Sequence, residues 1–85
     1  MENQDRIIES LRKEAEALQG PMTSEQRACL EDCLIRVRDD RYGFDLAICG
    51  DGYPRAVERR PGEQDREPRL VFRPDLEGAL LYHGE

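Results

Sequence analysis

The first part of the chain has the apolar periodicity of an amphipathic helix. From Gln4 to Gln19, apolar residues recur at intervals of three and four and form one stripe: Ile7, Ile8, Leu11, Ala15 and Leu18. Asn3 is placed to cap the start of this helix. Gly20-Pro21 ends it, because glycine accepts a left-handed backbone and proline cannot continue the helix. We expect the stripe to belong to the core.

A second helix is predicted to run to about Asp39. Thr23-Ser24-Glu25-Gln26 has the pattern of a capping box, in which the first and last residues satisfy each other's backbone donors. One face of this helix is apolar and consists of Cys29, Leu30, Cys33, Leu34 and Val37. Ile35 points the other way, toward a partner or under the C-terminal half, and we favour the second. The short link between the helices predicts an antiparallel hairpin.

Beyond Arg41 the apolar period changes from that of a helix to that of a strand. Residues 44–49 alternate in polarity, and the glycine-rich turn at 50–52 leads into a second alternating segment at 53–59. Pro54 marks this second segment as an edge strand. Further short strands are predicted at Arg69 to Arg73 and at Ala79 to His83, after a charged loop at 61–68 that has the least ordered pattern.

These elements predict an α+β fold in one small domain. A two-helix hairpin at 1–40 precedes a small antiparallel β or irregular half at 41–85. A chain of 85 residues buries only about two-thirds of its unfolded surface, so its stability margin is thin. Such domains often gain stability from a metal, a dimer or a partner. The sequence leaves the oligomeric state open, and a homodimer is one alternative.

The charge of −6 argues against a direct contact with nucleic acid, because a duplex-binding protein needs a basic face. No apolar run approaches the roughly 18 residues that span a bilayer. The polar, acidic start lacks the features of a signal peptide. The three cysteines, without an export signal, indicate reduced thiols. We therefore expect a cytoplasmic protein without a membrane partner.

The cysteines and the single histidine are the candidate metal ligands. Cys29 and Cys33 are four residues apart on one side of a helix, and Cys49 and His83 would complete a Cys3His zinc site. Zinc sites usually draw ligands from Cys-x-x-Cys knuckles, and that spacing is absent. The alternative is that the cysteines act as small apolar core residues. We expect no cofactor, with zinc as the second hypothesis.

Catalytic patterns are weak in this chain. Cys49 on a turn would need a nearby histidine or cation to become a nucleophile, and His83 lies two residues from the C-terminus. Gly50-x-Gly52 is not a phosphate loop, because no helix pattern begins after it and no P-loop lysine follows. We therefore expect a protein that is not an enzyme.

The stretch from Leu34 to Gly62 resembles the zinc-finger region of the TraR/DksA family of RNA-polymerase regulators. The residues that carry the resemblance are Leu34, Arg36 and Val37 at the helix end, Tyr42-Gly43, Cys49-Gly50-Asp51, Tyr53-Pro54, and then Ala56, Val57, Glu58, Arg60 and Pro61. This chain departs from the family at the metal site. Asp45 stands near the position at which the family has its first knuckle cysteine, and no cysteine follows Pro61 in this chain. The resemblance therefore implies a metal-free relative.

The resemblance implies a regulator that binds RNA polymerase, with acids and arginines aligning the contact. The predicted partner-binding residues are Asp39, Asp40, Arg41, Tyr42, Tyr53, Arg55, Arg59 and Arg60. Phe44 is a further candidate anchor, although we favour a place in the core. The alternative is a small acidic inhibitor or adaptor, for example from a phage or other mobile element, that blocks a nucleic-acid-handling complex by imitating phosphate charge. Whether loop 61–68 orders on binding stays open.

Overall fold

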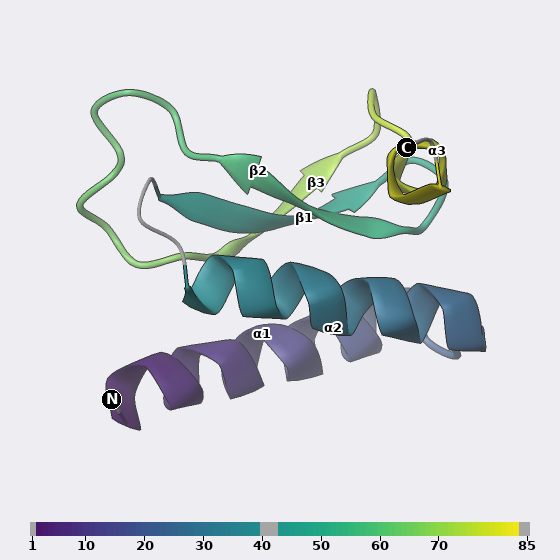
Figure 1. The fold of residues 1–85 in the computed structure, drawn as a ribbon, viewed down its shortest axis with the longest axis horizontal. Helices are drawn as coiled ribbons and strands as arrows, with labels where there is room; N and C mark the ends of the chain where they lie inside the picture. The colour runs from purple at the N-terminus through teal and green to yellow at the C-terminus, as the bar shows by residue number, and fades with distance from the viewer. Residues whose placement is uncertain (1, 40–42, 84–85) are drawn as a thin grey trace.

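The computed structural model describes residues 2–39 and 43–83 and joins two long helices to a three-stranded sheet (Figure 1). The elements in chain order are α1 (Glu2–Gln19), α2 (Ser24–Arg38), β1 (Phe44–Cys49), β2 (Pro54–Glu58), β3 (Leu70–Arg73) and α3 (Gly78–His83). The predicted α+β fold with an N-terminal helix pair is confirmed. None of the helices in the described part of the chain is long and apolar enough to cross a membrane.

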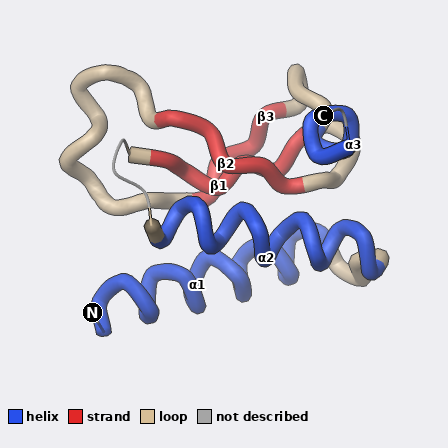
Figure 2. The backbone as a smooth tube through the Cα atoms, viewed as in Figure 1, coloured by secondary structure: helices blue, strands red, loops and turns tan. Residues whose placement is uncertain are grey.

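Helices α1 and α2 form the predicted hairpin and lie together against one face of the sheet (Figure 2). The capping box is confirmed, since the Thr23 hydroxyl accepts from the Gln26 N–H and the Gln26 amide oxygen accepts from the Thr23 N–H, each at 3.0 Å. Arg12 joins the two helices through a two-pronged ion pair with Glu31, with both N–O distances at 2.8 Å.

One core is shared by the hairpin and the sheet. Its buried members come from α1, α2 and β1: Leu11, Ala15, Leu30, Leu34, Val37, Leu46 and Ile48. Two predictions about apolar residues are wrong. Leu18 is 57% exposed, so the last position of the α1 stripe lies outside the core, and Ile35 is 49% exposed rather than packed under the β half.

The sheet has the order β2-β1-β3. Strands β1 and β2 pair antiparallel across the predicted turn, and Pro54 begins the edge strand β2 as expected. The prediction of an antiparallel sheet is wrong for β3, which pairs parallel to β1. The chain leaves β2, crosses past the start of β1 through residues 59–69 and then runs along the other side of β1. Alternation of polarity is the same in parallel and antiparallel strands, so the sequence pattern does not reveal this direction.

The strand predicted at Ala79 to His83 is wrong, because residues 78–83 form the short helix α3. A brief apolar run is ambiguous between strand and helix. The contacts that favour a helix here come from a residue distant in sequence. The carboxylate of Asp51, in the β1–β2 turn, accepts from the Gly78 N–H at 3.1 Å and from the Ala79 N–H at 2.8 Å. These bonds satisfy donors that the start of a helix leaves unpaired.

Two glycines allow the β1–β2 turn to lie directly against the segment that leads into α3. The Gly50 N–H donates to the Leu76 carbonyl at 3.0 Å. A Cβ on Gly50 would lie 2.5 Å from the Pro74 carbonyl oxygen, and one on Gly78 would lie 2.7 Å from the Tyr53 carbonyl oxygen. Side chains at these positions would therefore force the two segments apart.

Substituting Gly78→Ala tests this close approach. Helix propensity alone predicts that alanine stabilises α3 by up to about 1 kcal/mol, whereas the clash predicts a loss of about 1–3 kcal/mol. We expect a lower free energy of unfolding in urea denaturation. The control Lys13→Ala, at an exposed position of α1, should change stability by less than about 0.5 kcal/mol. A stabilised Gly78→Ala protein would contradict the packing of α3 on the turn.

Candidate functional site

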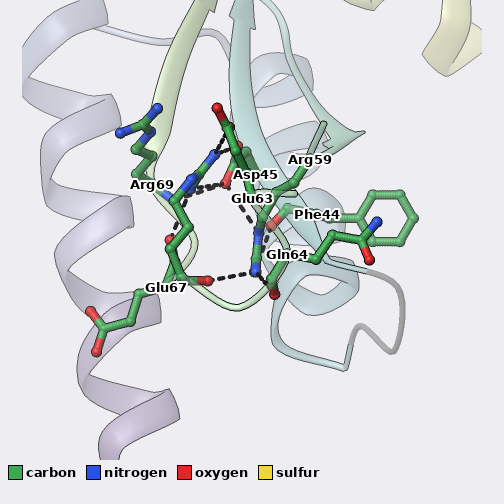
Figure 3. Close-up of polar contacts among 8 residues, drawn as sticks. Phe44, Asp45, Arg59, Glu63, Gln64, Glu67 and Arg69 are labelled. Atoms are coloured by element: carbon green, nitrogen blue, oxygen red, sulfur yellow. Dashed lines mark hydrogen bonds and ion pairs between the residues drawn. The ribbon is translucent and has the colours of Figure 1, made fainter. Parts of the chain in front are cut away.

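The most buried charged group in the described residues is the carboxylate of Asp45. This residue is only 4% exposed and lies on β1, on the sheet face opposite the helices, since the core residues Leu46 and Ile48 alternate with it. Arg66 donates to the two carboxylate oxygens at 3.1 and 2.7 Å, and the Arg69 N–H donates at 3.1 Å. Figure 3 shows these donors converging from the crossing segment onto β1.

Arg59 also contacts the Asp45 carboxylate, and together with Asp45 and Arg66 it forms what we call the Asp45 cluster. Its Nε lies 3.5 Å from the Asp45 carboxylate, and its NH1 donates to the carbonyls of Gln64 at 2.9 Å and Arg66 at 2.6 Å (Figure 3). The charged loop at 61–68 is therefore tied to β1 by arginines and backbone carbonyls. Arg59 is only 8% exposed. Its side chain is used within the protein, and its role in binding a partner stays a prediction.

The other predicted partner-binding residues that the structure describes lie on different elements. Asp39 is exposed at the end of α2, where Arg38 donates to it at 3.0 Å, whereas Tyr53 lies near the start of α2 and its hydroxyl donates to Glu25 at 2.6 Å. This hydrogen bond raises the pKa of Tyr53. Arg60 is exposed and Arg55 is half-buried on β2. Asp40, Arg41 and Tyr42 lie outside the described residues.

The turn that follows β1 is a junction of three helices. Gln19 at the end of α1 donates to the Gly52 carbonyl at 2.7 Å. The Tyr53 hydroxyl donates to Glu25 of α2, and the Asp51 carboxylate accepts from the first N–H groups of α3. Partial burial raises the pKa of the Asp51 carboxyl, but the backbone N–H groups of Ala79, Tyr53 and Gly78 outweigh it, and the net pKa lies below the ordinary value. The turn therefore has a structural role.

The thiols are buried or half-buried. The Cys29 Sγ donates to the Pro54 carbonyl at 3.1 Å. The hydrogen bond to Cys29 and burial raise the pKa of Cys33, and burial raises the pKa of Cys49. Across residues 2–39 and 43–83, no three histidine, cysteine, aspartate or glutamate side chains converge as metal ligands. The backbone of His83 belongs to α3, and its side chain lies outside the described part.

The outer edge of β3 is the feature that sequence reasoning missed. Leu46 donates to the Arg69 carbonyl at 3.1 Å, and this register directs the backbone groups of Val71 toward β1. The N–H and C=O groups of Leu70 and Phe72 consequently point outward, away from the sheet. No described strand pairs with this edge. Phe72 is 61% exposed, although its place in an alternating strand gave no sign of that.

A cleft of about 330 Å³ lies between α1 and the segment that enters β3. Its apolar lining includes Ile7, Leu11 and Pro68, and its charged lining includes two arginines and two glutamates: Arg6, Arg69, Glu14 and Glu67. Because Arg69 directly precedes β3 and α1 packs on β3, the cleft is adjacent to the open edge. Edge and cleft together are the candidate interaction surface.

No family model, no curated protein and no solved structure matches this chain. The resemblance to the TraR/DksA family stays a prediction.

The Asp45 cluster makes a prediction about stability. Asp45→Asn leaves two guanidinium groups facing a neutral side chain, and breaking a buried ion pair costs about 3 kcal/mol or more. We expect this loss in urea denaturation. The control Asp39→Asn removes an exposed ion pair and should leave the free energy of unfolding almost unchanged, because solvent screens such pairs. Equal losses in the two variants would show that the Asp45 cluster does not hold the crossing segment.

The Asp51 cap makes a prediction about pH. Since the folded-state pKa lies below the ordinary value of about 3.9, the charged cap stabilises the fold above pH 4, and this contribution is lost as pH falls through the folded-state pKa. Asp51→Asn should lower the Tm at pH 7, and the difference from the wild type should shrink toward pH 3. A Tm difference that is the same at pH 7 and pH 3 would contradict the assignment.

Proposed function

We propose that this chain is a non-enzymatic regulatory module that binds another protein through the outer edge of β3. The observation that carries the proposal is the exposed Phe72 on a strand whose outer backbone groups have no partner among the described residues. Exposed strand edges favour unwanted pairing, and natural proteins usually blunt them with prolines, charges or covering segments. An edge left open next to an exposed aromatic side chain is typical of a surface that pairs with a partner.

The opposite edge of the sheet gives an internal comparison. Strand β2 starts with Pro54, which has no N–H to offer, and α3 packs against it. Strand β3 has prolines only outside its span, at 68 and 74. One edge is thus blunted while the other is open, and this asymmetry supports a binding role for β3.

The state of the thiols supports a non-enzymatic role. A nucleophilic cysteine acts as the thiolate. The raised pKa of Cys33 and of Cys49 keeps these groups protonated at neutral pH. The hydrogen bond with Cys33 lowers the pKa of Cys29, but this thiol is buried and donates to the Pro54 carbonyl. All three side chains are buried or half-buried.

The resemblance to TraR/DksA proteins makes RNA polymerase the first partner to test. A module of this kind would regulate by competing for a surface of the polymerase. The acidic inhibitor or adaptor is the second hypothesis. It has support in the charge of −6, and it predicts binding to a basic, nucleic-acid-handling protein that weakens as salt rises.

Substituting Phe72→Ser tests the proposal in a pull-down from host lysate with quantitative mass spectrometry. We expect the captured partner to fall by about tenfold or more, as at a binding hot spot, while the Tm changes little because Phe72 is exposed. The matched control is Ile35→Ser, which removes an exposed apolar side chain from α2 and should leave capture intact. RNA polymerase subunits in the Phe72-dependent fraction would support the family resemblance. Equal capture by wild type and both variants, or capture of nothing, would contradict the proposal.

A further inference from the structure

The chemistry of the segment that the β3 edge binds can be inferred if the proposed function holds. We propose that the outer edge of β3 and the adjacent cleft bind an extended segment of a partner protein. The residues of this segment are, in order, an acid, an apolar residue, a β-branched residue, an apolar residue and a second acid. The segment adds a fourth strand to the sheet. Three features of the edge carry the inference: its backbone groups, its apolar face and the arginines beside it that have no ion pair with a described acid.

The backbone groups fix the mode of binding. Leu70 and Phe72 each present an outward N–H and C=O, separated by one residue. This spacing matches the alternate residues of an added strand, whose hydrogen bonds supply affinity without regard to sequence. A helix satisfies its own backbone groups and cannot use this edge.

The side chains beside the edge fix the apolar positions of the segment. Leu70 packs on the core from the helix-facing side of the sheet, and Phe72 has the same orientation by strand alternation. Residues of an added strand that lie opposite these two would enter the apolar side of the cleft, which is lined by Ile7, Leu11 and Pro68. Opposite Val71, on the other face, a β-branched residue packs best.

The charges beside the edge fix the flanking positions. Arg69 is exposed and has no ion pair with any described acid, and the same holds for Arg6 in the facing wall of the cleft. Figure 3 shows the Arg69 side chain pointing away from Asp45 to the other side of β3. Arg73 is paired with Asp75 at 3.1 Å, so an acidic residue of the partner segment beside Arg73 would contribute less to binding. An acid opposite Arg69 therefore contributes most to selectivity.

A second copy of this chain fits the edge poorly. Two β3 strands paired antiparallel about Val71 would place Arg69 of one copy opposite Arg73 of the other, and like charges in directly opposed positions are destabilising. Each copy also carries a charge of −6, which opposes association. A heterologous, acid-flanked segment avoids the first problem.

Fluorescence polarisation with the full chain and a labelled peptide, Ser-Gly-Glu-Ile-Val-Tyr-Glu-Gly-Ser, tests the proposal. The control peptide has lysine in place of both glutamates. We expect the glutamate peptide to bind more tightly, although the chain is acidic overall. Arg69→Glu should weaken the glutamate peptide by about fivefold and strengthen the lysine peptide. Arg36→Glu, which reverses the charge of an exposed arginine on α2, should leave the ratio between the two peptides unchanged.

N-methylation of the peptide tests whether it binds as a strand. Methyl groups on one alternate set of backbone nitrogens should abolish binding, and methyl groups on the other set should be tolerated, because alternate N–H groups point toward and away from β3. Equal tolerance of both sets would overturn strand addition. The proposal would also be overturned if neither peptide bound or if both bound with equal affinity. A concentration-dependent dimer in sedimentation that Phe72→Ser abolishes would overturn it as well. If Phe72-dependent capture of a partner persists while the peptides fail, only this inference is lost and the proposed function stands.

Discussion

The fold depends on the burial of one carboxylate, that of Asp45, among arginine and backbone donors. A buried charge is tolerated only when it is paired and its hydrogen-bonding capacity is met. Here Arg66 and the Arg69 N–H donate hydrogen bonds to the carboxylate, and the Arg59 guanidinium forms an ion pair with it. All three residues belong to the segment that crosses from β2 to β3. Satisfying the carboxylate therefore fixes where β3 enters the sheet and which direction it runs. Without this cluster the crossing segment, rich in charge and poor in apolar residues, has little to hold it.

The parallel addition of β3 determines the edge on which the proposed function depends. Its register with β1 turns the backbone groups of Leu70 and Phe72 to the outside, while the sheet's other edge begins with a proline and lies against α3. The same cluster that stabilises the fold thus presents the open edge. Binding at that edge needs no rearrangement of the core, because Leu70 already lies against it and Phe72 is already exposed. Such preorganisation lowers the entropic cost of capturing a partner.

Local signals predicted local structure well. The capping box at Thr23 and Gln26, the Gly20-Pro21 stop and the turn at 50–52 each specify their own conformation, so the helix hairpin and the β1–β2 pair could be read from the sequence. The sequence did not reveal the direction of β3, the helix α3 or the burial of Arg59. Each of them is decided by a contact across many residues, such as Asp51 with Ala79 or Arg66 with Asp45. The candidate interaction surface was missed for the same reason, since the open edge follows from strand order and not from the composition of β3.

Native-state hydrogen exchange followed by NMR tests the central claim, that the outer backbone of β3 is free to pair. The account predicts that the Leu70 and Phe72 amides exchange rapidly, while the Val71 and Arg73 amides, bonded to β1 in the parallel register, are protected nearly to the limit of global unfolding. Alternating fast and slow exchange along these four residues would establish the open edge directly. Equal protection of all four amides would mean that the edge is covered in the free protein, and would contradict the account.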